Sequence, residues 1–133
     1  MNDSGAPDPT PAALDPAALD KLRELDPQGR HGLLERVMTT YVNSLLRILG
    51  LLEAEATRGD VETVARLAHQ LKSSSASIGA MPLSRAAAEV ERELRAASAG
   101  SSADASVAIA RLLREGRGAA ASVNAMLASL RRP

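Results

Sequence analysis

Apolar residues recur at alternating spacings of four and three over a long stretch, from about Gly32 to Thr57. The positions on this stripe are Leu34, Met38, Tyr41, Leu45, Ile48 and Leu52. Such spacing places side chains on one face of an α-helix, which is buried when helices pack together. Gly59 and Asp60 follow, a helix-ending glycine and a helix-capping aspartate. The pattern predicts two antiparallel helices joined by a very tight turn.

The same period predicts further helices on both sides of this pair. Asp15 and Pro16 suit the N-cap and first position of a short helix with its own apolar stripe. The second helix of the pair is expected at about 61–78, and two more long helices follow at about 82–97 and 104–130. No stretch has the pattern of a strand. We therefore expect an all-α fold, an up-and-down antiparallel four-helix bundle with a short extra N-terminal helix.

The length of 133 residues suits a single domain. We assign residues 14–133 to the bundle and residues 1–13, which are rich in proline and alanine, to a disordered tail or linker. That start suits both a stand-alone protein and a piece of a longer one. Gly116 and Gly118 each cost the last helix about 1 kcal/mol relative to alanine, which indicates a bend or a close helix contact there.

Composition narrows the function classes. The 16 basic residues balance the 16 acidic ones, so no overall field attracts nucleic acid or an anionic membrane. There is no cysteine and there are only two histidines, which argues against a metal site. No window resembles a membrane span or a signal peptide, so we expect a cytoplasmic protein without membrane insertion. Aromatic content is 1%, which favours close-packed helices over a sheet.

The helix expected at 61–78 divides into two faces on a helical wheel. Its inward face holds Val61, Val64, Ala68, Leu71, Ser75 and Ile78. We favour a packing role for Ser75, because a small hydroxyl on that face can bond back to a carbonyl and allow tight helix packing. His69 projects outward instead, and the positions one to two turns away on the same side are Glu62, Ala65, Arg66, Lys72, Ser73 and Ala76. His31, in a glycine-flanked turn, is expected to be a solvated loop residue.

The surroundings of His69 suit phosphoryl chemistry carried out with a partner. A neutral imidazole is a competent nucleophile, and the cations Lys72 and Arg66 would attract and stabilise a phosphoryl group. Ser73 could hydrogen-bond phosphoryl oxygens, and small neighbouring side chains leave room for another active site. The chain carries no glycine-rich phosphate loop, so we expect no nucleotide site and no kinase activity of its own.

A family resemblance adds to this interpretation. The run AHQLKSSSASIGA, from Ala68 to Ala80, resembles the signature of histidine-containing phosphotransfer (Hpt) domains, A-H-x-L-K-G-S-x-x-x-x-G-A. The resemblance extends over about residues 14–130. It implies that His69 is the phosphoacceptor and that Lys72 lies beside the phosphoryl group.

The resemblance also assigns roles to the serines and glycine of the motif. It implies that Ser74 is the hydroxyl that assists the phosphoryl group and that Gly79 permits close packing near the helix end. Ser73 departs from the pattern, because glycine is usual at that position. We group Lys72, Ser73 and Ser74 as phosphoryl-stabilising residues.

The function implied is that of a phosphorelay intermediate in two-component signalling. His69 would accept a phosphoryl group from the aspartyl phosphate of one receiver domain and pass it to another. The partners would be receiver domains of response regulators or of a hybrid sensor histidine kinase. These receiver domains would supply Mg²⁺. The protein itself would be a monomer that binds no cofactor and no metal. The expected docking surface comprises Ala65, Arg66, Gln70 and Ala76, around His69.

Two alternatives stay open on the residues alone. A helical docking or adaptor module could bind a signalling protein through the same face and never be phosphorylated. The phosphoacceptor segment of a sensor kinase is disfavoured, because that family typically has an acidic residue after the histidine, where Gln70 stands here.

Overall fold

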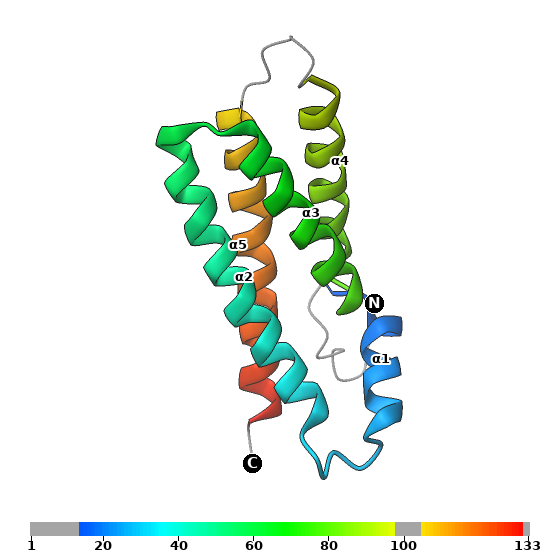
Figure 1. Ribbon diagram of the computed structural model, residues 1–133. Helices are drawn as coiled ribbons and strands as arrows, with labels where there is room; N and C mark the ends of the chain where they lie inside the picture. The colour runs from blue at the N-terminus through cyan, green and yellow to red at the C-terminus, as the bar shows by residue number, and fades with distance from the viewer. Residues whose placement is uncertain (1–13, 98–104, 132–133) are drawn as a thin grey trace, which may run out of the picture.

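The computed structural model describes residues 14–97 and 105–131, and all regular structure within them is helical. The helices are α1 (Pro16–Leu25), α2 (Leu33–Arg58), α3 (Val61–Ser77), α4 (Met81–Ala97) and α5 (Ala105–Leu130). Figure 1 shows α2 to α5 running alongside one another, with the short α1 at one end of the bundle. The all-α expectation is confirmed. Residues 1–13, predicted to be a tail or linker, lie outside the described residues.

Two aspartates fix the start of α1 and the connection between α1 and α2. Asp15 caps α1, since its carboxylate accepts a hydrogen bond from the Ala17 N–H at 3.0 Å. Asp26 joins α1 to α2, because one carboxylate oxygen accepts the N–H groups of His31 and Leu33, each at 3.1 Å. These bonds also hold the pKa of Asp26 below its usual value, with the Leu33 N–H the largest cause. The loop between α1 and α2 is therefore held by hydrogen bonds to Asp26.

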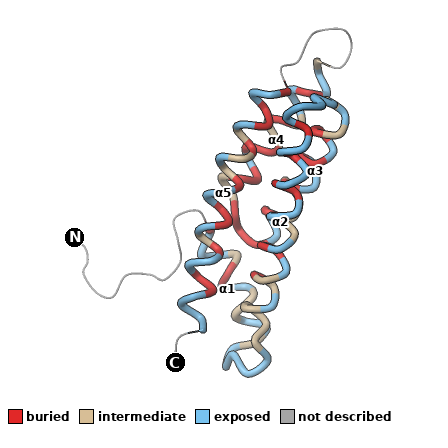
Figure 2. Tube along the Cα trace, turned by 90° about the vertical axis from the view of Figure 1, so that its left-hand side faces the viewer, coloured by how far each residue is buried: buried red, intermediate tan, exposed pale blue. Residues whose placement is uncertain are grey.

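The bundle interior is built from aliphatic side chains. Figure 2 shows buried residues recurring along each long helix, with exposed residues between them. α3 packs most extensively on α4, and α2 on α5. α2 and α5 approach closely at Gly116, where a Cβ atom would lie 2.5 Å from a methyl carbon of Leu49. The expected close helix contact is confirmed there. Gly118 has open space around it and takes no part.

The helices of the described ranges are also too short or too polar for a bilayer. None of them is long and apolar enough to cross a membrane.

Candidate functional site

The start of α3 is fixed by two acidic residues. Asp60 is the N-cap, and its carboxylate accepts hydrogen bonds from the N–H of Glu62 at 3.1 Å and the hydroxyl of Thr63 at 2.9 Å. The buried Glu55 accepts the N–H of Asp60 at 3.3 Å. Gly59 ends α2 in the left-handed conformation, with φ of +65°. The tight turn predicted at these residues thus sets where α3 begins.

The inward face of α3 follows the predicted pattern. Val64, Ala68 and Leu71 are completely buried. Ser75 is buried too, and its hydroxyl lies 2.7 Å from the hydroxyl of Tyr41 on α2. The packing role expected for Ser75 agrees with this burial, and its hydroxyl partner comes from α2, on the chain's single aromatic residue. This buried pair ties the helix that carries the site to α2.

His69 stands on the outer side of α3, with 55% of its side chain exposed. Its Nδ1 atom lies 3.0 Å from Oε2 of Glu91 on α4. An ionised carboxylate can only accept a hydrogen bond, so a neutral imidazole in this contact carries its proton on Nδ1. The lone pair is then on Nε2. The contact therefore fixes both the orientation of the ring and the nitrogen that can act as a nucleophile.

Glu91 connects three basic side chains. Besides His69, it accepts hydrogen bonds from Lys72 Nζ at 2.9 Å and from Arg95 Nε at 3.0 Å. The Lys72 hydrogen bond, followed by that of Arg95, lowers the pKa of Glu91 to about 2. Because 12% of its side chain is exposed, the carboxylate is held by these partners rather than by water. Glu91 is ionised at every pH at which a histidine acts as a nucleophile.

Sequence reasoning missed Glu91. It lies 22 residues after His69, and the neighbouring acidic residues Glu89 and Glu93 alternate with it along α4. Only the packing of α4 on α3 decides which of the three reaches the imidazole. The signal that could have found it is the spacing of Glu91 from two core residues of α4, Ala87 four positions before it and Leu94 three positions after it.

Lys72 lies beside His69 as predicted, but its ammonium group is bound to Glu91. The lysine and the histidine are therefore joined through one carboxylate. The α3 backbone under Lys72 is supported as well, since the buried Ser84 donates its hydroxyl to the Lys72 carbonyl at 2.9 Å. The cation is thus held next to the imidazole by α4.

The two serines after Lys72 differ in what they offer. Ser73 is exposed on the His69 side of α3, and its carbonyl accepts the hydroxyl of Ser77 at 3.1 Å. Ser74 is half-buried, and its hydroxyl donates to the Gln70 carbonyl at 3.0 Å. The Ser74 hydroxyl is directed into its own helix, so its role beside a phosphoryl group stays a prediction. Ser73 has the more accessible position.

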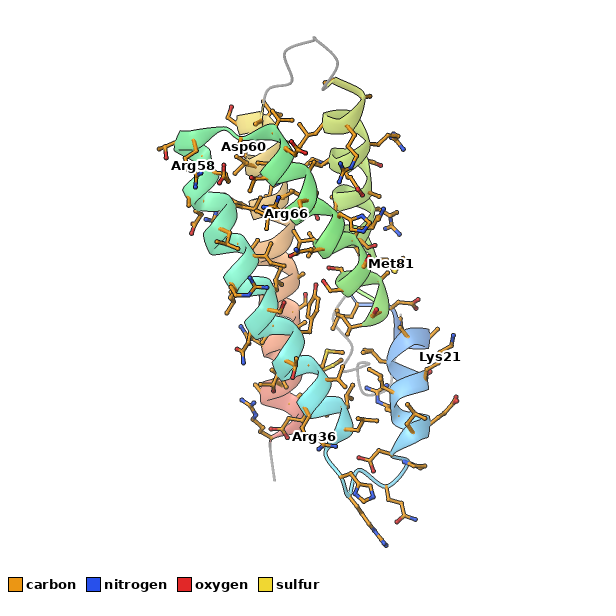
Figure 3. The ribbon with its side chains drawn as sticks, viewed as in Figure 1. Lys21, Arg36, Arg58, Asp60, Arg66 and Met81 are labelled. Carbon is orange, nitrogen blue, oxygen red and sulfur yellow. The ribbon has the colours of Figure 1, made fainter. Side chains whose placement is uncertain are left out.

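Three of the four expected docking residues are exposed around His69, namely Arg66, Gln70 and Ala76. Figure 3 labels Arg66 on α3. The fourth is a correction, because Ala65 is only 2% exposed. It lies on the flank of α3 that faces α4, the same flank from which Lys72 reaches Glu91. An alanine there is covered by the neighbouring helix, so Ala65 belongs to the core.

Gly79 permits the close packing that the motif implies. Its φ is +83°, and a Cβ atom would lie 2.8 Å from the Cβ of Ala18 on α1. Its carbonyl also accepts the N–H of Asp15 at 2.7 Å. A side chain would strain the backbone and push α1 away. Gly79 is thus the point at which α1 attaches to the end of α3.

Among the residues that the structure describes, no cluster of three or more His, Asp or Glu side chains could hold a metal ion. His31, the other histidine, is exposed in the turn between α1 and α2, as expected. The charged and titratable groups gathered at the site are the imidazole of His69, the carboxylate of Glu91 and the cations Lys72 and Arg95.

The model of the Hpt domain family matches residues 36–132. The structure is similar to that of histidine-containing phosphotransfer protein B (HptB) from Pseudomonas aeruginosa PAO1, with a TM-score of 0.73 and 22% identity over 89% of this chain and 96% of that chain.

A putative histidine-containing phosphotransfer protein from rice is also similar, with a TM-score of 0.70 and 22% identity over 88% of this chain and 81% of that chain. Comparison with curated proteins gave no match. At these identities the two structures establish the likeness of the fold, and the family model carries the assignment.

Proposed function

Because the chain belongs to the Hpt domain family, a family of phosphotransfer modules in two-component phosphorelays, we propose that it relays a phosphoryl group through His69. The donor is the aspartyl phosphate of one receiver domain, and the acceptor is the aspartate of another. The observation that supports this most is the exposed imidazole whose Nδ1 is bound to Glu91, which leaves Nε2 free to react.

The transfer step follows from this arrangement. The Nε2 lone pair of His69 forms a bond to phosphorus while the bond from phosphorus to the aspartyl oxygen breaks, and that electron pair leaves with the aspartate. The Nδ1 proton stays on the ring, which gains positive charge facing the ionised Glu91. Attack by the aspartate of a second receiver reverses the step. Glu91 thus stabilises the charge that develops in both directions.

The cations Lys72 and Arg95 offset the negative charge of the phosphoryl group. Lys72 is one helical turn from His69, and Arg95 shares the same carboxylate. Both side chains place positive charge beside the phosphoryl group during its transfer. That charge offsets the repulsion between the phosphoryl oxygens and the Glu91 carboxylate. We propose that the receiver domain supplies the aspartate carboxylate and the Mg²⁺ and that this chain binds no cofactor. Contact around Arg66, Gln70, Ser73 and Ala76 would be that of a transient interface.

Label transfer tests the proposal. The protein is mixed with a receiver domain carrying a labelled aspartyl phosphate, and acid-labile, base-stable label is followed on the chain. We expect label on the parent and on His31→Gln, the matched control in an exposed loop, and none on His69→Gln. Label that persists in His69→Gln would contradict the assignment. Binding of the receiver without any label would instead support a docking module that is never phosphorylated.

The charge role of Lys72 has its own test. We expect Lys72→Ala to slow transfer about tenfold, equivalent to about 1.4 kcal/mol of activation free energy. Its helix content should stay that of the parent, because the Lys72 side chain is 38% exposed and lies outside the core. Equal transfer rates for variant and parent would remove the lysine from the mechanism.

A further inference from the structure

The serines in the second half of α3 use their hydroxyl groups differently. The Ser74 and Ser77 hydroxyls each donate to the carbonyl group four residues before them, at 3.0 and 3.1 Å. The buried Ser75 hydroxyl lies 2.7 Å from the hydroxyl of Tyr41. Ser73 is exposed, and no group of the described residues binds its hydroxyl. Ser73 is therefore the serine of this run whose hydroxyl is available to a ligand.

Ser73 lies one turn after His69 on the surface of α3. Residues at this spacing on a helix have Cβ atoms about 5–6 Å apart. At about 100° per residue, Ser73 is about 40° to one side of His69 and Lys72 is about 60° to the other side. Because Lys72 reaches Glu91 on α4, Ser73 is on the flank of His69 that turns away from α4. The free hydroxyl and the lysine thus stand on opposite sides of the imidazole.

The contact between His69 and Glu91 directs the reactive nitrogen away from α4. The two nitrogens of an imidazole point in different directions, so a ring whose Nδ1 faces Glu91 presents Nε2 away from that carboxylate. A phosphoryl group on Nε2 carries three oxygens that accept hydrogen bonds strongly. One oxygen can turn toward Lys72 and Arg95 while another lies on the side of Ser73. A hydroxyl can rotate to donate to that oxygen.

A hydrogen bond from Ser73 to the phosphoryl group exists only in the phosphorylated chain. Its acceptor is a charged oxygen, and hydrogen bonds to charged groups are stronger than those between neutral groups. An interaction that is made in one of two states shifts the equilibrium toward that state. The hydroxyl keeps its proton and forms no bond to phosphorus, so the transfer step itself is unchanged. The phosphorylated form of the chain is stabilised.

We propose that Ser73 retains the phosphoryl group on His69 and thereby shifts the relay equilibrium toward this chain. Its hydroxyl donates to a phosphoryl oxygen on the side opposite Lys72, whereas the Ser74 hydroxyl, which is used inside α3, takes no part. The glycine that is usual at this position of the motif has no such donor. This inference rests on the proposed function and adds to it which way the transfer is biased.

Three variants of the full chain test the role of Ser73. Ser73→Ala removes the hydroxyl and Ser73→Thr keeps it. The matched control is Ser77→Ala, which removes an exposed hydroxyl one turn farther along α3. Each chain is phosphorylated with phosphoramidate, a small phosphodonor, and the loss of phosphohistidine is followed after the donor is removed. Forward and reverse rates of transfer with a phosphorylated receiver domain are then measured, and their ratio gives the equilibrium constant.

We expect Ser73→Ala to shorten the half-life of phosphohistidine about threefold and to lower the equilibrium constant for transfer to the chain about fivefold, because one hydrogen bond to the phosphorylated state is lost. Ser73→Thr and Ser77→Ala should stay within about twofold of the parent in both measurements, because each keeps the hydroxyl at residue 73.

A parent-like half-life and equilibrium constant in Ser73→Ala overturn the role of Ser73 and leave the relay function standing. A loss in Ser73→Thr as large as in Ser73→Ala also overturns that role, because the hydroxyl would then not be the cause. A parent chain that phosphoramidate labels and no phosphorylated receiver labels overturns the relay function itself, and the bias assigned to Ser73 with it.

Discussion

At the scale of single residues, Glu91 decides how His69 can react. Its carboxylate holds Nδ1 of the ring, and Lys72 and Arg95 keep that carboxylate ionised. In the proposed relay, this one acidic side chain orients the imidazole and gathers positive charge beside the phosphoryl group. Ser74 contributes less directly, because its hydroxyl is used inside α3.

Glu91→Gln should slow phosphoryl transfer to His69 about ten- to hundredfold. A hydrogen bond to a charged group is worth about 1.5–3 kcal/mol, and the neutral amide loses that support for the positive ring. The amide can also donate to Nδ1, so ¹⁵N NMR of the imidazole should change from one dominant tautomer to a mixture. Glu93→Gln, two residues along α4, is the control and should keep the parent spectrum. An unchanged tautomer in Glu91→Gln would contradict the orienting role.

At the scale of helices, close contacts at small residues set how the bundle packs. Gly116 brings α5 against Leu49 of α2, and Gly79 brings α1 against the end of α3. The Tyr41 and Ser75 hydroxyls add a polar link between α2 and α3. Burial raises the pKa of Tyr41, so this phenol stays protonated and able to donate a hydrogen bond. Each contact fixes one pair of helices.

Alanine at the two glycines of α5 should have opposite effects on the free energy of unfolding. Gly118→Ala should stabilise by about 1 kcal/mol, because it adds helix propensity in open space. Gly116→Ala should destabilise by about 1–3 kcal/mol, because its Cβ would displace the buried Leu49. Urea unfolding measures both. Equal stabilisation by the two substitutions would mean that α2 and α5 do not approach closely there.

Breaking the link between α2 and α3 should be asymmetric. Ser75→Ala should cost about 1–3 kcal/mol, because it leaves the buried Tyr41 hydroxyl without its partner. Tyr41→Phe should cost less, because the Ser75 hydroxyl can rotate to a carbonyl of its own helix. A double-mutant cycle in urea should give a coupling free energy of about 0.5 kcal/mol or more. Strictly additive effects would contradict a shared hydrogen bond.

At the scale of the whole molecule, carboxylates with lowered pKa values link stability to pH. The pKa is lowered for Asp26, Asp60, Glu89 and Glu91. Each of these groups binds a proton less readily in the folded state than in the unfolded chain. Their stabilisation is therefore present above the unfolded values of 3.8 for Asp and 4.5 for Glu, and it is lost as the pH falls.

The free energy of unfolding should accordingly stay constant from about pH 7 to 5 with respect to these groups and fall below that. For Glu91 the loss should continue to a pH of about 2, where its folded-state pKa lies. Urea titrations at a series of pH values measure this. Asp60→Asn should give a shallower decline with acid, because it removes one such group. A stability that rises on acidification below pH 4 would contradict the assignment.

The sequence by itself determined the helices and the outward direction of His69. Apolar spacing is a local property, and so are the N-caps at Asp15 and Asp60 and the glycine at the end of α2, so α1 to α5 begin and end within a residue or two of the prediction. The outward direction of His69 follows from the same period. The motif also implied close packing at Gly79, where a Cβ atom would meet α1.

The tertiary structure decided what surrounds that histidine. Glu91 reaches the imidazole, and Ala65 is buried, because separate helices pack side by side. A helical wheel gives the direction of a side chain from its own axis and holds no information about which neighbouring helix lies there. The local pattern thus determines the position of His69, whereas its contact with Glu91 and the arrangement of Lys72 and Arg95 exist only once α3 and α4 have packed.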